Sequence, residues 1–143
     1  MKIFLDTNAV LDFMIPTRKD HAAMKTILGF SKYNKLEMLT SAMSLATSAY
    51  VLRDEPDYFL ETTKIFRRYV GIADMPDYVV DEALKMEHSD FEDALQLVCS
   101  ATECCDVIIT RDKHHFSDKY TTQQIYTPAE FLAKAKASAS RQT

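Results

Sequence analysis

The N-terminal segment at residues 2–8, Lys-Ile-Phe-Leu-Asp-Thr-Asn, constrains the fold more than any other part of the chain. Its apolar residues are consecutive and do not alternate with polar ones. This pattern is typical of a strand that is buried on both faces of a parallel sheet covered by helices. Asp6 would then lie at the carboxyl end of the strand, where open α/β sheets bind their ligands. We therefore expect Asp6 to belong to a cluster of carboxylates that holds a divalent metal ion.

The rest of the chain alternates predicted strands with predicted helices. Further strands are expected at residues 37–40, 70–73, 106–110 and 123–126. Helices are expected at residues 9–15, 41–53, 58–69, 77–86 and 90–105, with one more after Asp20 and one after the capping box Thr127-Pro128-Ala129-Glu130. This order predicts a three-layer α/β/α domain with a central parallel sheet of four to five strands. We expect a single domain at residues 1–137 and a flexible tail at residues 138–143.

Composition indicates an ordinary globular protein, with 47% hydrophobic and 27% charged residues. No apolar run approaches the roughly 20 residues that a membrane span needs, and no signal peptide is evident. These features predict a cytoplasmic protein without a membrane partner. The three cysteines, Cys99, Cys104 and Cys105, are an odd number in a helical pattern, and we expect them to be reduced structural thiols.

Charge and glycine content narrow the possible functions. A net charge of −4 argues against a broad basic surface for nucleic acid, although bound metal ions would reverse the charge locally. The chain contains only two glycines, Gly29 and Gly71. Glycine-rich loops that bind nucleotide phosphates are therefore excluded.

Acidic residues recur at the predicted carboxyl edge of the sheet. Asp112 follows the strand at residues 106–110, so it shares a crevice with Asp6 if the two strands are neighbours. In the helix at residues 90–105, Asp90 and Asp93 flank the predicted core face and can converge. That face contains Phe91, Ala94, Leu95, Val98, Ala101 and Thr102, whereas Glu92, Gln96 and Glu103 are expected on the solvated face. Helix capping is the structural alternative for Asp90 and Asp93, and a turn position is the alternative for Asp6 and Asp112.

Three segments in this order and spacing resemble the motifs of the PIN-domain ribonucleases, a family that includes the VapC-like toxins of bacterial toxin–antitoxin pairs. They are Ile3-Phe4-Leu5-Asp6-Thr7-Asn8, Asp90-Phe91-Glu92-Asp93-Ala94-Leu95 and Ile108-Ile109-Thr110-Arg111-Asp112. The resemblance implies a PIN-like fold and a metal-dependent endoribonuclease with an RNA substrate. It also implies a homodimer and an inhibitory antitoxin whose tail enters the acidic crevice. By similarity, Asp6, Asp93 and Asp112 are metal-binding acids, with Asp90 as an adjunct.

The chain departs from the family at one position. PIN domains usually carry a glutamate on the helix after the second strand, but residues 41–50 contain no acid. Thr47 or Ser48 occupies the corresponding place. The loss predicts either a weaker metal site in which Asp90 compensates, or a catalytically degenerate PIN domain that binds RNA or protein without cleavage.

The proposed ligands suit magnesium or manganese, because both ions prefer hard oxygen ligands. We expect Asp6, Asp93 and Asp112 to hold one or two Mg²⁺ or Mn²⁺ ions that activate water for attack on a phosphodiester. Asp90 would position that water. The supporting residues Thr7, Asn8, Thr47 and Thr110 offer hydroxyl or amide groups at the site, and Thr7, Asn8 and Thr110 would orient the acids.

Two further interpretations concern the neighbouring residues. The basic patch beside Asp112 is either an RNA-backbone contact or a solvated loop, and it contains Arg111, Lys113, His114, His115 and Lys119. The adjacent histidines are a weaker alternative as metal ligands.

An aspartate-nucleophile phosphatase or a receiver domain also places an acid after its first strand. That class requires a further acid close by, where this chain has Thr7 and Asn8.

Overall fold

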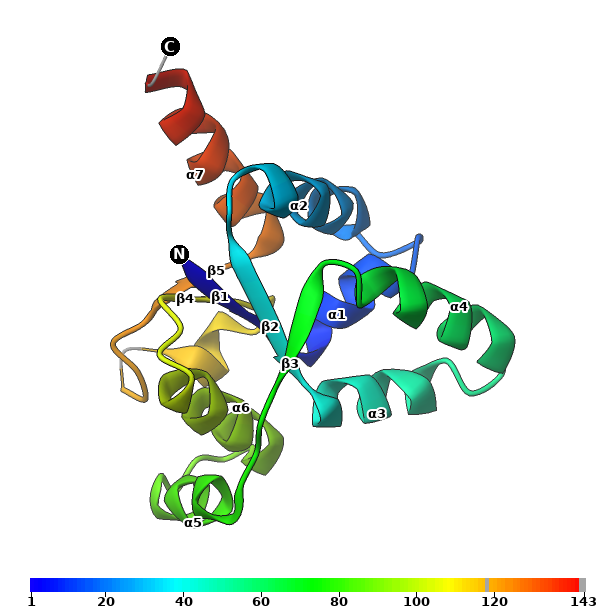
Figure 1. Cartoon of the computed structure of the whole chain (residues 1–143). Coiled ribbons are helices and arrows are strands. Elements are labelled where there is room, and N and C mark those ends of the chain that lie inside the picture. The colour runs from blue at the N-terminus through cyan, green and yellow to red at the C-terminus, as the bar shows by residue number, and fades with distance from the viewer. Residues whose placement is uncertain (118, 142–143) are drawn as a thin grey trace.

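Five parallel strands form the central sheet of the protein (Figure 1), in a computed structural model that describes residues 1–117 and 119–141. The strands are β1 (Lys2–Leu5), β2 (Glu37–Ser41), β3 (Val70–Ala73), β4 (Val107–Ile109) and β5 (Gln124–Tyr126). Their order across the sheet is β3-β2-β1-β4-β5, with β1 in the centre. Ile3 is in register with Met38 of β2 and with Val107 of β4. The two most apolar segments of the chain are therefore neighbours.

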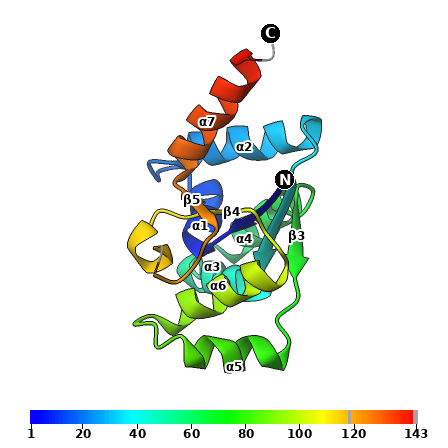
Figure 2. The same ribbon diagram turned by 90° about the vertical axis from the view of Figure 1, so that its left-hand side faces the viewer.

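Helices cover both faces of this sheet. They are α1 (Thr7–Met14), α2 (His21–Tyr33), α3 (Ala42–Val51), α4 (Pro56–Phe66), α5 (Asp77–Lys85), α6 (Phe91–Thr102) and α7 (Pro128–Arg141), with a short 3₁₀ helix η1 (Lys113–Phe116). Figure 2 shows α5 and α6 on one side of the sheet and α2 and α7 on the other. The predicted three-layer α/β/α fold with a parallel sheet is confirmed.

Strand β1 divides the core into two parts. Ile3 and Leu5 pack in the cluster on the α1, α2 and α7 side, and Phe4 packs in the cluster on the α5 and α6 side. All three side chains have no exposed surface. Burying an apolar side chain of this size contributes roughly 1.5–3 kcal/mol, so a consecutive apolar run is most stable at the sheet centre.

Several local predictions can be compared with the described residues. The capping box forms, because the backbone nitrogens of Thr127 and Glu130 each donate to the other residue's side chain, at 2.9 and 3.2 Å. Residues 138–141 were expected in a tail, but α7 continues as a helix through Arg141, and residues 142 and 143 lie outside the described residues. The prediction of a buried helix at residues 41–53 is wrong in part, because Tyr50 is 67% exposed. Cys99, Cys104 and Cys105 are free thiols.

No helix within residues 1–117 and 119–141 is both long enough and apolar enough to cross a membrane.

Candidate active site

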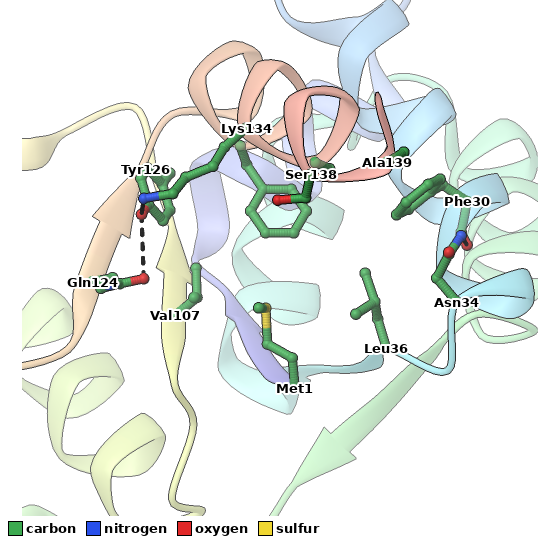
Figure 3. A pocket seen from close by; sticks show the side chains of 12 residues that line it. Met1, Phe30, Asn34, Leu36, Val107, Gln124, Tyr126, Lys134, Ser138 and Ala139 are labelled. Carbon is green, nitrogen blue, oxygen red and sulfur yellow. Dashed lines mark hydrogen bonds between the residues drawn. The ribbon is translucent and has the colours of Figure 1, made fainter. Parts of the chain in front are cut away.

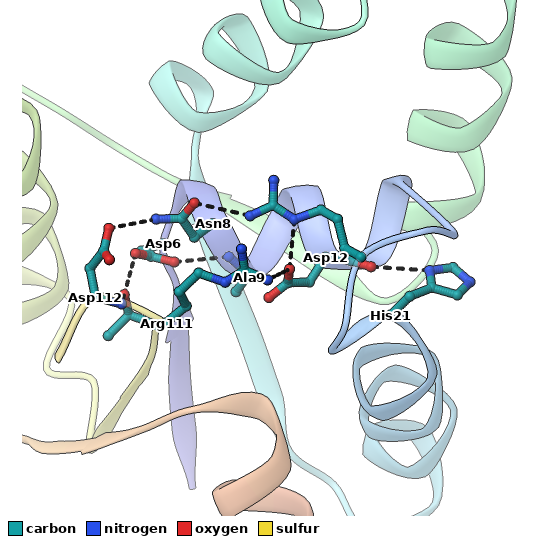
Figure 4. A network of polar contacts seen from close by, with 9 residues as sticks. Asp6, Asn8, Ala9, Asp12, His21, Arg111 and Asp112 are labelled. Carbon is teal, nitrogen blue, oxygen red and sulfur yellow. Dashed lines mark hydrogen bonds and ion pairs between the residues drawn. The ribbon is translucent and has the colours of Figure 1, made fainter.

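Asp6 is a buried carboxylate at the point where β1 passes into α1 (Figure 4). It caps α1, since its Oδ1 accepts a hydrogen bond from the backbone nitrogen of Ala9 at 2.9 Å. Its Oδ2 accepts from the hydroxyl of Thr110 at 2.5 Å. Burial raises the pKa of Asp6 to about 7, and these two hydrogen bonds oppose the shift. The charges of Asp93 and Asp112 raise the pKa further, which places the three acids in one electrostatic environment.

Asp112 reaches the same crevice from the end of β4. The backbone nitrogen of Asp112 donates to the hydroxyl of Thr110 at 3.0 Å, so Thr110 connects Asp112 to Asp6. The amide of Asn8 donates to Asp112 Oδ2 at 2.9 Å. Because Leu5 of β1 is in register with Ile109 of β4, the polar residues that follow the two strands meet at one edge of the sheet.

The start of α6 contributes two further acids. Asp90 caps this helix, with its Oδ1 accepting from the backbone nitrogen of Asp93 at 3.1 Å. Asp93 Oδ2 lies 2.5 Å from Nδ1 of His115. Burial and the charge of Asp90 raise the pKa of Asp93, whereas His115 lowers it. Capping and a role at the site are therefore compatible for Asp90, because one of its oxygens is used by the helix and the other is not.

Asp90, Asp93 and His115 bring three potential metal-binding side chains together at this corner. One ligand atom each of Asp90, Asp93 and His115 lie within 4.8 Å of one another, and no other set of three such residues does so within residues 1–117 and 119–141. Asp6 and Asp112 are outside this compact set. The sequence pointed to the adjacent histidines only as a weak alternative, because the contact between His115 and Asp93 depends on where η1 packs.

His88 holds η1 against the start of α6. Its Nδ1 accepts from the backbone nitrogen of Asp90 at 2.9 Å, so its Nε2 carries the hydrogen. That Nε2 donates to the carbonyl oxygen of His115 at 2.7 Å. The His88 ring also packs against Tyr120, with centroids 4.3 Å apart. These contacts fix the loop that carries His115 relative to Asp90.

The buried face of α6 differs from the predicted one. Gln96 was expected on the solvated face but is only 1% exposed, whereas Phe91, expected in the core, is 45% exposed. The amide of Gln96 donates to the hydroxyls of Thr7 and Ser44, at 3.0 and 2.5 Å. Because these partners satisfy its polar atoms, the glutamine can be buried without a large penalty. The spacing of apolar residues, from which the buried face was predicted, does not reveal such hydrogen-bond partners.

Glu92 is the acid that the sequence placed on the wrong side of α6. Its Oε1 accepts a hydrogen bond from the hydroxyl of Thr7 at 2.9 Å and a longer one from Thr47 at 3.4 Å. Thr47 is the residue at the place where the sequence lacks an expected glutamate. A carboxylate therefore lies beside this position, but α6 supplies it and α3 does not.

Two of the predicted RNA-contact residues, Arg111 and Lys113, already form ion pairs within the chain. Arg111 is 3.1 Å from Asp12 Oδ1, and Lys113 is 3.1 Å from Glu130. Asp12 is fully buried and also pairs with Arg18 at 2.8 Å. Arg18 in turn donates to Asn8 at 3.2 Å, so this ion-pair network extends to Asp112 (Figure 4).

The remaining residues of the basic patch lie near the same loop. His114 is exposed, and the ammonium of Lys119 lies 5.3 Å from the centre of the Tyr120 ring. An RNA contact for Arg111, Lys113 and His114 stays a prediction.

The donor set fits a hard divalent cation. Asp6, Asp90, Asp93 and Asp112 offer carboxylate oxygens, and His115 offers one imidazole nitrogen. Oxygen donors suit Mg²⁺, and a set that includes an imidazole also suits Mn²⁺. The assignment of Asp6, Asp93 and Asp112 as ligands stays a prediction.

An apolar pocket of about 250 Å³ lies elsewhere, between α2 and α7 (Figure 3). Met1, Leu36, Val107 and Gln124 line it, and these residues lie at the amino ends of the strands. The pocket is therefore at the opposite edge of the sheet from Asp6 and carries none of the acids described above.

Comparison with known proteins agrees with this architecture. Ribonuclease VapC1 of Aquifex aeolicus (strain VF5) is 26% identical over 139 residues, which cover 93% of this chain and 94% of that protein. The structure of VapBC2 from Rickettsia felis, bound to a promoter DNA fragment, contains a chain with a TM-score of 0.71 and 13% identity, covering 89% of this chain and 98% of that one.

The structure of Mycobacterium tuberculosis VapC20, a sarcin-ricin loop cleaving toxin, has a TM-score of 0.67 at 17% identity and covers 85% of this chain and 98% of that one. At such low identity these two structures show a shared fold. The sequence model of the PIN domain matches residues 2–114, which include β1, α6 and β4 together with Asp6, Asp90, Asp93 and Asp112. The chain belongs to the PIN-domain family.

Proposed function

We propose that this PIN-domain protein is a divalent-metal-dependent endoribonuclease and the toxin of a toxin–antitoxin pair. The observation that carries the proposal is that Asp6 follows β1 at the carboxyl edge of the sheet, where the charges of Asp93 of α6 and of Asp112, which follows β4, act on it. The relationship to Ribonuclease VapC1 and the fold shared with the VapBC2 and VapC20 structures support it.

Each acid has a defined part in the proposed chemistry. Asp6, Asp93 and Asp112 would hold Mg²⁺ or Mn²⁺. When bound, the ion supplies a Lewis acid that lowers the pKa of water and stabilises the leaving oxygen of the phosphodiester. Thr110 keeps Asp6 oriented, and Asn8 does the same for Asp112. Asp90 has one oxygen that is not used in capping, and this oxygen would position the attacking water.

The proposal places RNA and protein partners at the same edge of the sheet. Arg111 and Lys113 would contact RNA phosphates after exchanging their ion pairs with Asp12 and Glu130. The proposal further includes a cytoplasmic location, a homodimer and a cognate antitoxin that covers the acidic crevice.

A cleavage assay tests the proposal. Purified protein is incubated with RNA in Mg²⁺, in Mn²⁺ or in EDTA, beside the variant Asp6→Asn and the matched control Asp81→Asn, which changes an exposed acid on α5. We expect cleavage with either metal, none in EDTA, and at least a ~100-fold loss in Asp6→Asn, because removing a group that acts in the transition state costs several kcal/mol. Equal cleavage by wild type and Asp6→Asn contradicts the proposal. RNA binding without cleavage by the wild type identifies the degenerate, binding-only alternative.

A further inference from the structure

Glu92 is held by hydrogen bonds from two other helices, which a glutamate on the protein surface does not need. It lies in the first turn of α6, directly before Asp93, and is partly buried between α1 and α3. We propose that Glu92 is a further acid of the metal site and that α6 delivers it to the position where α3 carries Thr47. This inference rests on the proposed function and adds a residue to its site.

The two oxygens of Glu92 differ in their surroundings. Oε1 is oriented by the hydroxyls of Thr7 and Thr47. Oε2 accepts no hydrogen bond from the part of the chain that the structure describes. The carboxylate is thus fixed through one oxygen, and the other is left for a ligand. This is the arrangement expected of a cation ligand whose orientation is set by neighbouring groups.

A buried hydrogen-bond network ends at Glu92. The Ser41 hydroxyl donates to the side-chain oxygen of Gln96 at 3.0 Å, the Gln96 amide donates to Thr7 at 3.0 Å, and Thr7 donates to Glu92. Each hydrogen in this series points toward the carboxylate. Such a series strengthens the hydrogen bond that Thr7 donates to Glu92, because aligned hydrogen bonds strengthen one another.

The network also links Glu92 to the predicted ligands through the chain itself. Thr7 directly follows Asp6, and Glu92 directly precedes Asp93. The hydrogen bond between Thr7 and Glu92 therefore joins the two segments that carry Asp6 and Asp93. A purely structural contact between α1 and α6 would require a hydrogen-bond acceptor but no negative charge, and the amide oxygen of a glutamine would supply it equally well.

That difference defines the experiment. Mn²⁺ binding is measured by isothermal titration calorimetry for the wild type, Glu92→Gln, Asp6→Asn and the control Glu55→Gln, which changes an exposed acid before α4. The double variant Glu92→Gln/Thr47→Glu returns the carboxylate from α3, since the Thr47 hydroxyl is only 3.4 Å from Glu92 Oε1. Melting temperatures in EDTA verify that each variant is folded.

We expect Glu92→Gln to weaken Mn²⁺ binding by ~10- to 100-fold, with a melting temperature in EDTA equal to or above that of the wild type. We expect the double variant to recover most of the lost affinity and Glu55→Gln to bind as the wild type does. Wild-type affinity in Glu92→Gln, together with lost binding in Asp6→Asn, would overturn the inference and leave the proposed function intact. A wild type that binds no Mn²⁺ would overturn both.

Discussion

The carboxyl group of Asp6 is buried even when no cation is bound to it. Only 2% of the residue is exposed, and its two oxygens accept one hydrogen bond each from the surrounding protein. Burial nevertheless dominates and raises the pKa to about 7, so the charged form is unfavourable in the metal-free protein. A divalent cation would reverse this balance, because it favours the ionised carboxylate. Metal binding and ionisation of Asp6 should therefore be coupled.

The first prediction concerns the pH dependence of stability in EDTA. Between the ordinary pKa of 3.8 and about 7, folded Asp6 keeps its proton while the unfolded chain has released it. The folded state then binds more protons, so the free energy of unfolding should fall as the pH rises through this range. Asp6→Asn should reduce the slope, leaving a smaller one from Asp12 and Asp93, whose pKa values are also raised.

Urea denaturation at several pH values between about 4 and 8 measures this slope for both proteins. Above pH ~7 the Asp6 contribution should be constant, because both states are then ionised. Identical slopes in the wild type and Asp6→Asn would show that Asp6 is not the buried titrating group.

At the scale of elements, sequence patterns identified the strands better than the faces of the helices. Residues 3–5 and 107–109 have no polar position, and only the centre of a covered sheet buries such runs on both faces. This also placed Asp6 and Asp112 at one edge, since the end of each run fixes where the polar residues lie.

The orientation of α6 could not be obtained in the same way. Its buried face includes Gln96 and Ser100, whose hydrogen-bond partners come from α1, α3 and the segment before β5. Glu92 was likewise expected on the solvated face, and His115 was only a weak candidate for a metal ligand. Their positions depend on contacts with Thr7, Thr47 and Asp93, which are distant in sequence from their partners, and no local periodicity encodes them.

The second prediction concerns the ion pairs that join α1 to the loops on either side. Asp12 of α1 is fully buried and contacts Arg18 before α2 and Arg111 after β4. Arg18→Met should leave this carboxylate with one cationic partner and lower the free energy of unfolding by about 3 kcal/mol. Lys64→Met removes the exposed ion pair with Glu61 and should cost less than about 0.5 kcal/mol.

Urea unfolding at neutral pH measures both variants. The Arg18 change should also weaken metal binding, because Arg18 donates to Asn8, and Asn8 orients Asp112. Equal losses in the two variants would mean that burial of Asp12 does not make its ion pairs more important than a surface pair.

For the whole molecule, charge is the main obstacle to an RNA substrate. The chain has a net charge of −4, and its candidate site is built from acids, so a polyanion would be repelled from the carboxyl edge of the sheet without bound cations. The basic groups nearby do not remove this difficulty, because Arg111 and Lys113 are paired with acids of the same chain. Under the proposed function, divalent cations would therefore assist the approach of the substrate as well as the chemistry.

The third prediction is that Mg²⁺ or Mn²⁺ stabilises the folded protein. A ligand that binds only the folded state at about 100 times its Kd adds about 2.7 kcal/mol, which corresponds to a rise in Tm of roughly 5–10 °C for a domain of this size. Asp6→Asn should show little of this rise, although it should melt at or above the wild-type temperature in EDTA, since it removes a carboxyl group whose ionisation is unfavourable at this buried position. Thermal melts with each metal, and with NaCl at the same ionic strength, separate binding from general screening of the acidic surface. A Tm that rises equally in NaCl, or equally in Asp6→Asn, would attribute the stabilisation to screening and contradict a metal site at the end of β1.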